Sequence, residues 1–261
     1  MALSHTISGT GSPPIVFVHG FGCGRTDWAA QVEHFSPRHQ TIAVDLPGHG
    51  DTPPAVGGGS IQEAGAEVAS LLRTKSMLSA VLVGHSMGCR VVLEAALQAP
   101  ENVSGIVLLD GSRFPPRSVS AVEARFASGE YASMVRGMFK QMFTASSDPK
   151  IIDSIEVRAL GMSEVVGKAM LLSMVRYDEG NLEQSLEALH KPLLVLQTTF
   201  VNDKRERVPM TAGQTTPYLD FIRSKVPSAR IEVLPGVGHF PQIEAPVETN
   251  RILASFIDSL A

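Results

Sequence analysis

Short apolar runs that end at glycine or proline recur along this chain, and they constrain its fold more than any other feature. Each run is rich in β-branched or long aliphatic residues and too short for a helix, so each predicts a buried strand. The runs lie at Pro13–Gly20, Thr41–Gly50, Ala80–Ser86, Gly105–Ser112, Lys191–Thr199 and Ala229–His239. Because these strands are almost continuously apolar, both of their faces are expected to be covered, which is typical of a parallel sheet.

Helical stretches separate most of these strands. They lie at about Thr26–Phe35, Ile61–Leu72, Gly88–Gln98, Pro217–Val226 and Pro246–Leu260. Strands alternating with helices predict an α/β fold, with a mostly parallel sheet of about seven strands and helices on both faces. Since the crossovers are right-handed, the loops after the strands gather along one edge, where open α/β sheets bind ligands.

The alternation stops after the fourth predicted strand. Helical candidates without an intervening strand lie at Val119–Ala127, Tyr131–Phe143, Lys150–Leu160 and Ser163–Val175. We therefore expect residues 1–113 and 191–261 to form the core domain, with residues 114–190 inserted as a helical cap between two late strands.

Methionines are frequent in this expected cap. Met134, Met138 and Met142 are spaced four residues apart, which places them on one face of the second candidate helix. We expect this face to pack onto the core and to give a substrate pocket an adaptable apolar wall.

A glycine-flanked serine connects the third predicted strand to the helix after it. Residues 84–88 read Gly-His-Ser-Met-Gly. Between a strand and a helix, such a turn holds its serine in a strained backbone conformation with the hydroxyl clear of the sheet edge. The helix dipole also favours negative charge near the turn. The context predicts Ser86 as a nucleophile.

A serine hydroxyl needs a base to take its proton. His239 follows the last predicted strand in a glycine-containing loop, from which it would reach the same edge as Ser86. We therefore expect His239 to be the base.

Acyl chemistry also needs donors for an oxyanion. The glycine-rich sequence His-Gly-Phe-Gly-Cys-Gly, residues 19–24, ends the first predicted strand. The backbone N–H groups of Phe21 and of Met87, the residue after the serine, are the expected donors.

Together these motifs resemble the α/β-hydrolase fold superfamily, and within it the small capped serine hydrolases. The matching segments, in the family's order, are HGFG at 19–22, DLPGHG at 45–50, GHSMG at 84–88 and GVGHFPQIEAP at 236–246. The resemblance implies Ser86 as nucleophile, His239 as base, Phe21 and Met87 as oxyanion donors, and a helical cap. Because few residues precede Pro13, it also implies that one of the family's two N-terminal strands is missing.

The acid of the expected triad departs from the family pattern. Family members usually carry it a few residues after the penultimate strand, where this chain has Val201. The nearest substitute is Asp203, in a charged loop, and the alternative is Asp110, at the end of the strand after the nucleophile. Either aspartate could hold the histidine tautomer. We favour Asp110 because it directly ends a strand and is therefore rigidly placed.

Charge and composition exclude several other classes of function. The net charge is -4 with no basic block, which argues against nucleic acid or an anionic membrane as partner. The N-terminal residues show no secretory signal, no apolar run is long enough to span a membrane, and two cysteines are too few for a disulfide scaffold, so we expect a cytoplasmic protein. Metal-ligand spacings and nucleotide-binding glycine motifs are missing from the sequence, so we expect no metal and no cofactor.

The expected reaction is hydrolysis of a carboxylic ester of a small, largely apolar molecule through an acyl-enzyme. Phe114, Phe139 and the methionines favour an apolar substrate. Two alternatives stay open: C–C bond hydrolysis or a lyase of the menaquinone-pathway type, with an arginine such as Arg90, Arg113 or Arg117 binding a substrate carboxylate, and a ligand-binding receptor without catalysis. The sequence leaves the oligomeric state undetermined.

Overall fold

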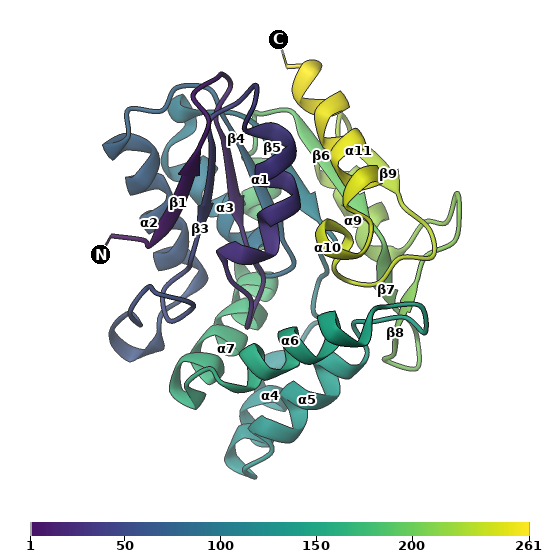
Figure 1. The fold of residues 1–261 in the computed structure, drawn as a ribbon. Helices are drawn as coiled ribbons and strands as arrows, with labels where there is room; N and C mark the ends of the chain where they lie inside the picture. The colour runs from purple at the N-terminus through teal and green to yellow at the C-terminus, as the bar shows by residue number, and fades with distance from the viewer. Residues whose placement is uncertain (1, 261) are drawn as a thin grey trace.

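A seven-stranded sheet forms the centre of the computed structural model, which describes residues 2–260 (Figure 1). Its strands are β1 (His5–Ser8), β2 (Ile15–Val18), β3 (Thr41–Val44), β4 (Ala80–His85), β5 (Val103–Leu109), β6 (Leu193–Gln197) and β9 (Arg230–Val233). Their order is β1-β3-β2-β4-β5-β6-β9, in which β1 pairs antiparallel with β3 and the other neighbours pair in parallel. The predicted mostly parallel α/β sheet is confirmed, and one strand precedes Pro13.

Helices cover both faces of the sheet, as predicted. They are α1 (Ala29–Phe35), α2 (Ile61–Thr74), α3 (Gly88–Gln98), α9 (Pro217–Lys225), α10 (Pro241–Glu244) and α11 (Pro246–Asp258), with short 3-10 turns η1 (Arg25–Trp28), η2 (Val56–Gly58) and η3 (Pro100–Asn102). Alternate residues of each strand enter two separate cores. Phe17 of β2 packs on the side of α1 and α11, whereas Val16 and Val18 pack on the side of α2, α3 and α9.

Helices without a strand fill the chain between β5 and β6. They are α4 (Ser118–Ala127), α5 (Tyr131–Lys140), α6 (Pro149–Leu160), α7 (Glu164–Gly180) and α8 (Leu182–Glu187). In Figure 1, α4 to α7 form a group below the sheet, near the small antiparallel hairpin of β7 (Thr199–Val201) and β8 (Arg207–Pro209). The sequence did not predict α8 or this hairpin, whereas the resemblance left room for one strand before Pro13, which is β1.

The expected methionine face of α5 is wrong in one position. The helix ends at Lys140, so Met142 lies beyond it, where its N–H donates to the carbonyl of Phe139. The following Thr-Ala-Ser-Ser-Asp-Pro sequence explains the early end, because Ser, Thr and Asp side chains satisfy nearby backbone groups outside helices. Met142 is nevertheless buried, and Met134 and Met138 pack against the same core.

None of the helices within residues 2–260 combines the length and the apolar character needed to cross a membrane.

Candidate active site

The structure brings Ser86, His239 and Asp110 into one hydrogen-bonded chain. Ser86 Oγ lies 2.9 Å from Nε2 of His239, and Nδ1 of His239 lies 2.5 Å from Oδ2 of Asp110. Asp110 and His239 are buried, and Ser86 is partly exposed. Because a carboxylate only accepts, Nδ1 carries the proton, which leaves the lone pair of Nε2 to accept from the serine hydroxyl.

Ser86 lies at the turn between β4 and α3, in the left-handed region with a φ of 54°. The crossing of strand and helix at this turn requires glycine. A Cβ on Gly84 would lie 2.3 Å from the carbonyl oxygen of Gly88, and one on Gly88 would lie 2.4 Å from that of Val18. The strained serine and its two glycines are therefore one unit, as the motif predicted.

Asp110 follows β5 directly and is cradled by the end of β6. Its Oδ1 accepts from the backbone N–H groups of Thr198 at 2.8 Å and Thr199 at 2.7 Å. Its Oδ2 accepts from the hydroxyl of Thr199 at 2.5 Å. The loop in which family members usually place the acid thus donates hydrogen bonds to an acid from the neighbouring strand.

Burial and nearby charges both shift the pKa values of Asp110 and His239. Burial alone would raise the pKa of Asp110, but the hydrogen bond and charge of His239, followed by the charge of Arg207, lower it. The pKa of His239 is lowered, chiefly by burial and then by Arg207, against the raising effect of Asp110. At neutral pH the resting pair is therefore an ionised aspartate and a neutral histidine, the state in which Nε2 can accept a proton.

His85, inside the serine turn, supports the histidine loop. Its Nε2 lies 2.7 Å from the carbonyl oxygen of His239, so this nitrogen carries the proton. Burial lowers the pKa of His85 to about 3, which keeps the ring neutral.

The glycine-rich loop that follows β2 lies against the nucleophile. A Cβ on Gly20 would lie 3.1 Å from Cβ of Ser86, so the next residue, Phe21, is adjacent to the serine turn. Two buried histidines brace this region: His49 Nε2 accepts from the N–H of Gly22 at 3.2 Å, and His19 Nε2 accepts from the N–H of Leu46 at 3.0 Å.

Helices α5 and α6 contact this loop from the other side. The rings of Phe21 and Phe139 lie 6.4 Å apart. A Cβ on Gly22 would lie 2.8 Å from Cβ of Ala159 and 3.1 Å from the ring of Phe139. The wall above the loop is therefore apolar and closely packed.

The segment between α5 and α6 also holds the histidine loop. The N–H of His239 donates to the carbonyl of Met142 at 2.7 Å, and the hydroxyl of Ser147 donates to Oε2 of Glu244 at 2.5 Å. Next to these contacts, the rings of Phe143 and Phe240 stack with centroids 5.1 Å apart.

Arg207 is a site residue that the sequence interpretation missed. It lies in the charged loop that contains Asp203, and its Nη1 lies 3.5 Å from Oδ2 of Asp110 and donates to Oγ1 of Thr199 at 2.7 Å. The available signal was the short apolar stretch on each side of the run, which is typical of a hairpin.

Asp203, the alternative acid, lies in the turn between β7 and β8 and is exposed. The structure does not bring it to His239, which pairs with Asp110 instead.

Two of the three arginines considered for a substrate carboxylate interact with other groups. Arg90 is buried in a two-point ion pair with Asp178, at 2.7 Å from Nε and 2.5 Å from Nη2. Arg113 lies over the ring of Phe221 with its Cζ 4.0 Å from the centroid. Arg117 begins α4 in a left-handed conformation and is exposed.

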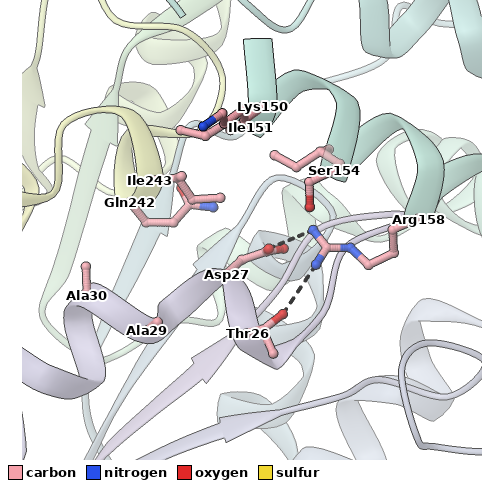
Figure 2. Close-up of a pocket in the computed structure, with 11 residues that line it drawn as sticks. Thr26, Asp27, Ala29, Ala30, Lys150, Ile151, Ser154, Arg158, Gln242 and Ile243 are labelled. Carbon is pink, nitrogen blue, oxygen red and sulfur yellow. Dashed lines mark hydrogen bonds and ion pairs between the residues drawn. The ribbon is translucent and has the colours of Figure 1, made fainter. Parts of the chain in front are cut away.

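A cavity of about 430 Å³ lies beside α6, α10 and the start of α1 (Figure 2). Its lining residues are Thr26, Asp27, Ala29, Ala30, Lys150, Ile151, Ser154, Ile155, Arg158, Gln242 and Ile243, and none of the triad is among them. Figure 2 shows Arg158 of α6 reaching Asp27 and Thr26, at 2.6 and 3.3 Å. Because Asp27 also accepts from the N–H of Gly24 at 3.1 Å, this ion pair connects α6 to the glycine-rich loop.

Comparisons with known proteins find relatives that are similar over nearly the whole chain. It is 27% identical over 263 residues to the "Dihydrolipoyllysine-residue acetyltransferase component of acetoin cleaving system" of Pseudomonas putida. The aligned region covers 96% of this chain and 65% of that protein. The chain therefore spans about two thirds of the length of that relative. It is 28% identical over 273 residues to the "Pimeloyl-[acyl-carrier protein] methyl ester esterase" of Methylococcus capsulatus, covering 99% of this chain and all of that protein.

Solved structures show the same fold. A thermophilic esterase from Thermogutta terrifontis superposes with a TM-score of 0.82 at 23% identity, covering 99% of this chain and 93% of the esterase. The model of the alpha/beta hydrolase family matches residues 15–252, which is most of the sequence. The chain belongs to the alpha/beta hydrolase family.

Proposed function

We propose that this protein is a serine hydrolase that cleaves carboxylic esters of small, largely apolar molecules through an acyl-enzyme. The observation that carries the proposal is the hydrogen-bonded chain from Ser86 through His239 to Asp110, at 2.9 and 2.5 Å. Nucleophile, base and orienting acid within hydrogen-bond distance form the arrangement that acyl transfer to water requires.

In the acylation step, Ser86 Oγ attacks the ester carbonyl carbon while His239 Nε2 takes the hydroxyl proton. Asp110 stabilises the imidazolium that forms and stays ionised. The carbonyl oxygen becomes an oxyanion, for which the backbone N–H groups of Phe21 and Met87 are the proposed donors. The C–O bond then breaks, and His239 returns its proton to the leaving alcohol.

In the deacylation step, His239 takes a proton from water, which attacks the acyl carbon on Ser86. The second tetrahedral intermediate uses the same oxyanion donors. Its collapse breaks the bond to Oγ, releases the carboxylic acid and restores the serine hydroxyl, so no cofactor or metal enters the proposed cycle.

The surroundings of Ser86 favour an apolar substrate. Phe21 and Phe139 supply aromatic surface beside the serine turn. We also propose that residues 114–190 act as a cap, since α5 and α6 lie directly on the glycine-rich loop. The engagement of Arg90 with Asp178 and of Arg113 with Phe221 favours an ester over the carboxylate-bearing substrates of the C–C alternative. The relative from Methylococcus capsulatus is named as an ester hydrolase, which agrees with this reaction class.

The first test is hydrolysis of a p-nitrophenyl ester series by the wild type and three variants. We expect Ser86→Ala to lose about 10⁶-fold in kcat and Asp110→Asn about 10⁴-fold, because the first removes the nucleophile and the second leaves the histidine in the wrong tautomer. Asp203→Asn is the matched control, and its kcat should equal that of the wild type.

A Ser86→Ala protein that still turns over the esters would contradict the proposal. If Asp203→Asn loses its activity and Asp110→Asn keeps it, the acid of the site is Asp203 in the hairpin and not Asp110. If the wild type hydrolyses no ester but cleaves a vinylogous diketone, the C–C alternative replaces this one. Binding of such ligands without any product would favour the receptor.

A further inference from the structure

Arg207 lies beside the carboxylate that orients His239. Its Nη1 is 3.5 Å from Oδ2 of Asp110 and donates to Oγ1 of Thr199 at 2.7 Å. Its side chain is only 12% exposed, and that of Asp110 is fully buried. A guanidinium removed from water in this way needs a counter-charge, and here it faces the carboxylate of Asp110.

The hairpin and the segment after α5 fix the position of Arg207. Its backbone N–H donates to Oε1 of Gln141 at 3.1 Å, and Val201 of β7 pairs opposite it. The hydroxyl of Thr199 accepts from Arg207 and donates to Oδ2 of Asp110, the same oxygen that pairs with Nδ1 of His239, so a relay of donors converges on that oxygen. Such a relay restricts the carboxylate to one orientation.

Several other titratable groups lie around this pair. The groups that face His239 and Asp110 from the elements packed against them are Arg207, His85, Cys89, Tyr218 and Glu244. Burial lowers the pKa of His85 to about 3 and raises that of Cys89 to about 12, so both are neutral near pH 7. Burial also raises the pKa values of Tyr218 and Glu244, neither of which can carry positive charge. Arg90 is a second buried cation nearby, which interacts with Arg207, Cys89 and Tyr218 but is paired with Asp178. Among the described residues, Arg207 is therefore the cation that acts on His239 and Asp110.

We infer that Arg207 is a positioning residue of the proposed hydrolytic site, which anchors Asp110 and sets the lowest pH at which His239 can accept a proton. The inference rests on the proposed roles of Asp110 and His239. It gives the charged loop that contains Asp203 a role in the proposed site, through Arg207.

The physical reason is competition for the same carboxylate. While Arg207 neutralises Asp110, less of that negative charge remains to stabilise a protonated His239, and the guanidinium also repels an imidazolium. This agrees with the lowered pKa of His239, for which burial is the first cause and Arg207 the second. Catalysis needs neutral His239, so a lower pKa keeps the enzyme active at lower pH. Removing the cation would raise the pKa and move the acidic limb of the activity profile to higher pH.

The test measures His239 directly and then through catalysis. The imidazole titration is followed by NMR in the wild type, Arg207→Met and Arg207→Lys, with the spectrum of His239→Gln to assign the signals. The pH dependence of kcat/KM for a p-nitrophenyl ester is measured on the same proteins. We expect Arg207→Met to raise both midpoints by roughly one pH unit. Arg207→Lys should keep both midpoints near the wild-type values, because it keeps the positive charge.

Arg205 provides the matched control. It lies in the same hairpin and is exposed, so Arg205→Met removes the same charge without touching Asp110 and should leave both midpoints unchanged. Circular dichroism and urea unfolding check that each variant is folded. If Arg207→Met does not fold, Arg207→Gln removes the charge while keeping a donor for Thr199.

An unchanged or lowered His239 midpoint in a folded Arg207→Met or Arg207→Gln protein would overturn the inference. An equal shift in Arg205→Met would overturn it too, because the effect would then be the general field of the hairpin. If the NMR midpoint rises but the profile of ester hydrolysis stays in place, the inference holds, and it is the proposed role of His239 as base that fails.

Discussion

Gly22 shows how closely the proposed cap rests on the glycine-rich loop. Its φ of 68° lies in the left-handed region, and a Cβ there would lie 2.8 Å from Cβ of Ala159. A methyl group at this position would push the loop away from α6 and would displace the N–H of Phe21, the proposed oxyanion donor. The tight packing is therefore tied to the geometry of the site.

We expect Gly22→Ala to lower kcat for ester hydrolysis by about 10²-fold, the cost of misplacing one oxyanion donor. Gly57→Ala is the matched control, since Gly57 has a φ of 73° but nothing within 4 Å of its added Cβ. The backbone strain should lower the free energy of unfolding of the control by about 1–2 kcal/mol in urea titrations, but its kcat should stay at the wild-type value. Equal kcat values for the two variants would show that contact with α6 does not position the loop.

Residues with local signals were the ones that the sequence could predict. Ser86 lies in a five-residue motif with a strand before it and a helix after it, and His239 follows a strand. The acid could be narrowed only to two candidates, Asp110 and Asp203, of which Asp110 was favoured. The hairpin that carries Arg207 has a weak local signal, but the burial of Arg207 has none, because it depends on Thr199 and on Asp110, which lies 97 positions away in the sequence.

At the scale of elements, a buried ion pair connects α3 to α7. Arg90 donates to both carboxylate oxygens of Asp178 and also to the carbonyl of Ser112 at 2.8 Å. Asp178 accepts in addition from the N–H of Phe114 at 2.8 Å. The helix that follows Ser86, the end of β5 and the long helix of the proposed cap are therefore held at one point.

Breaking this pair from one side should be costly, because it leaves a buried charge without its partner. We expect Asp178→Asn to lower the free energy of unfolding by about 3–5 kcal/mol in urea titrations. Replacing both partners, as Asp178→Leu with Arg90→Met, should recover part of that loss.

The exposed pair between Arg176 of the same helix and Glu123 serves as the comparison. Glu123→Gln should cost at most about 1 kcal/mol. An equally small loss in Asp178→Asn would mean that the pair between α3 and α7 is not held out of water.

Elements whose stability comes from the core were predictable, and those fixed by partners far along the chain were not. The apolar runs of β2 to β6 could be predicted because strands buried on both faces must be apolar, whereas β9 is half-buried and alternates charged and apolar residues. Strand β1 is half exposed, and β7 and β8 are three residues each, so their sequences carry no periodicity. The end of α5 was misplaced because methionine spacing continues past Lys140 although the helix does not.

For the whole molecule, several histidines are buried in the neutral form. Burial lowers the pKa of His19 well below its ordinary value, that of His49 to about 4 and that of His85 to about 3. In the unfolded chain these rings would titrate near about 6.5. Between that pH and about 4, the unfolded state binds more protons than the folded state, so stability must fall as the pH falls.

We expect the free energy of unfolding to drop by about 1.4 kcal/mol per buried histidine for each pH unit below about 6.5. Urea unfolding at pH 7.5 and at pH 5 measures the difference. His49→Gln should reduce this difference by the share of one histidine, whereas His34→Gln, at an exposed position, should not. Identical differences in all three proteins would show that His49 does not remain neutral in the fold.

The segment between α5 and α6 has a consequence for exchanging caps between relatives. Gln141, Met142 and Ser147 hold Arg207, His239 and Glu244, so the stretch that arrives with the cap also aligns the base. A chimaera that replaces residues 114–190 as one block would also replace the segment that hydrogen-bonds to His239. Grafts that keep residues 141–147 of the recipient should change the substrate specificity while preserving kcat. If the proposed cap and triad are right, exchange of substrate specificity in this protein is limited by residues 141–147, which belong to the cap in sequence and contact the proposed catalytic residues in space.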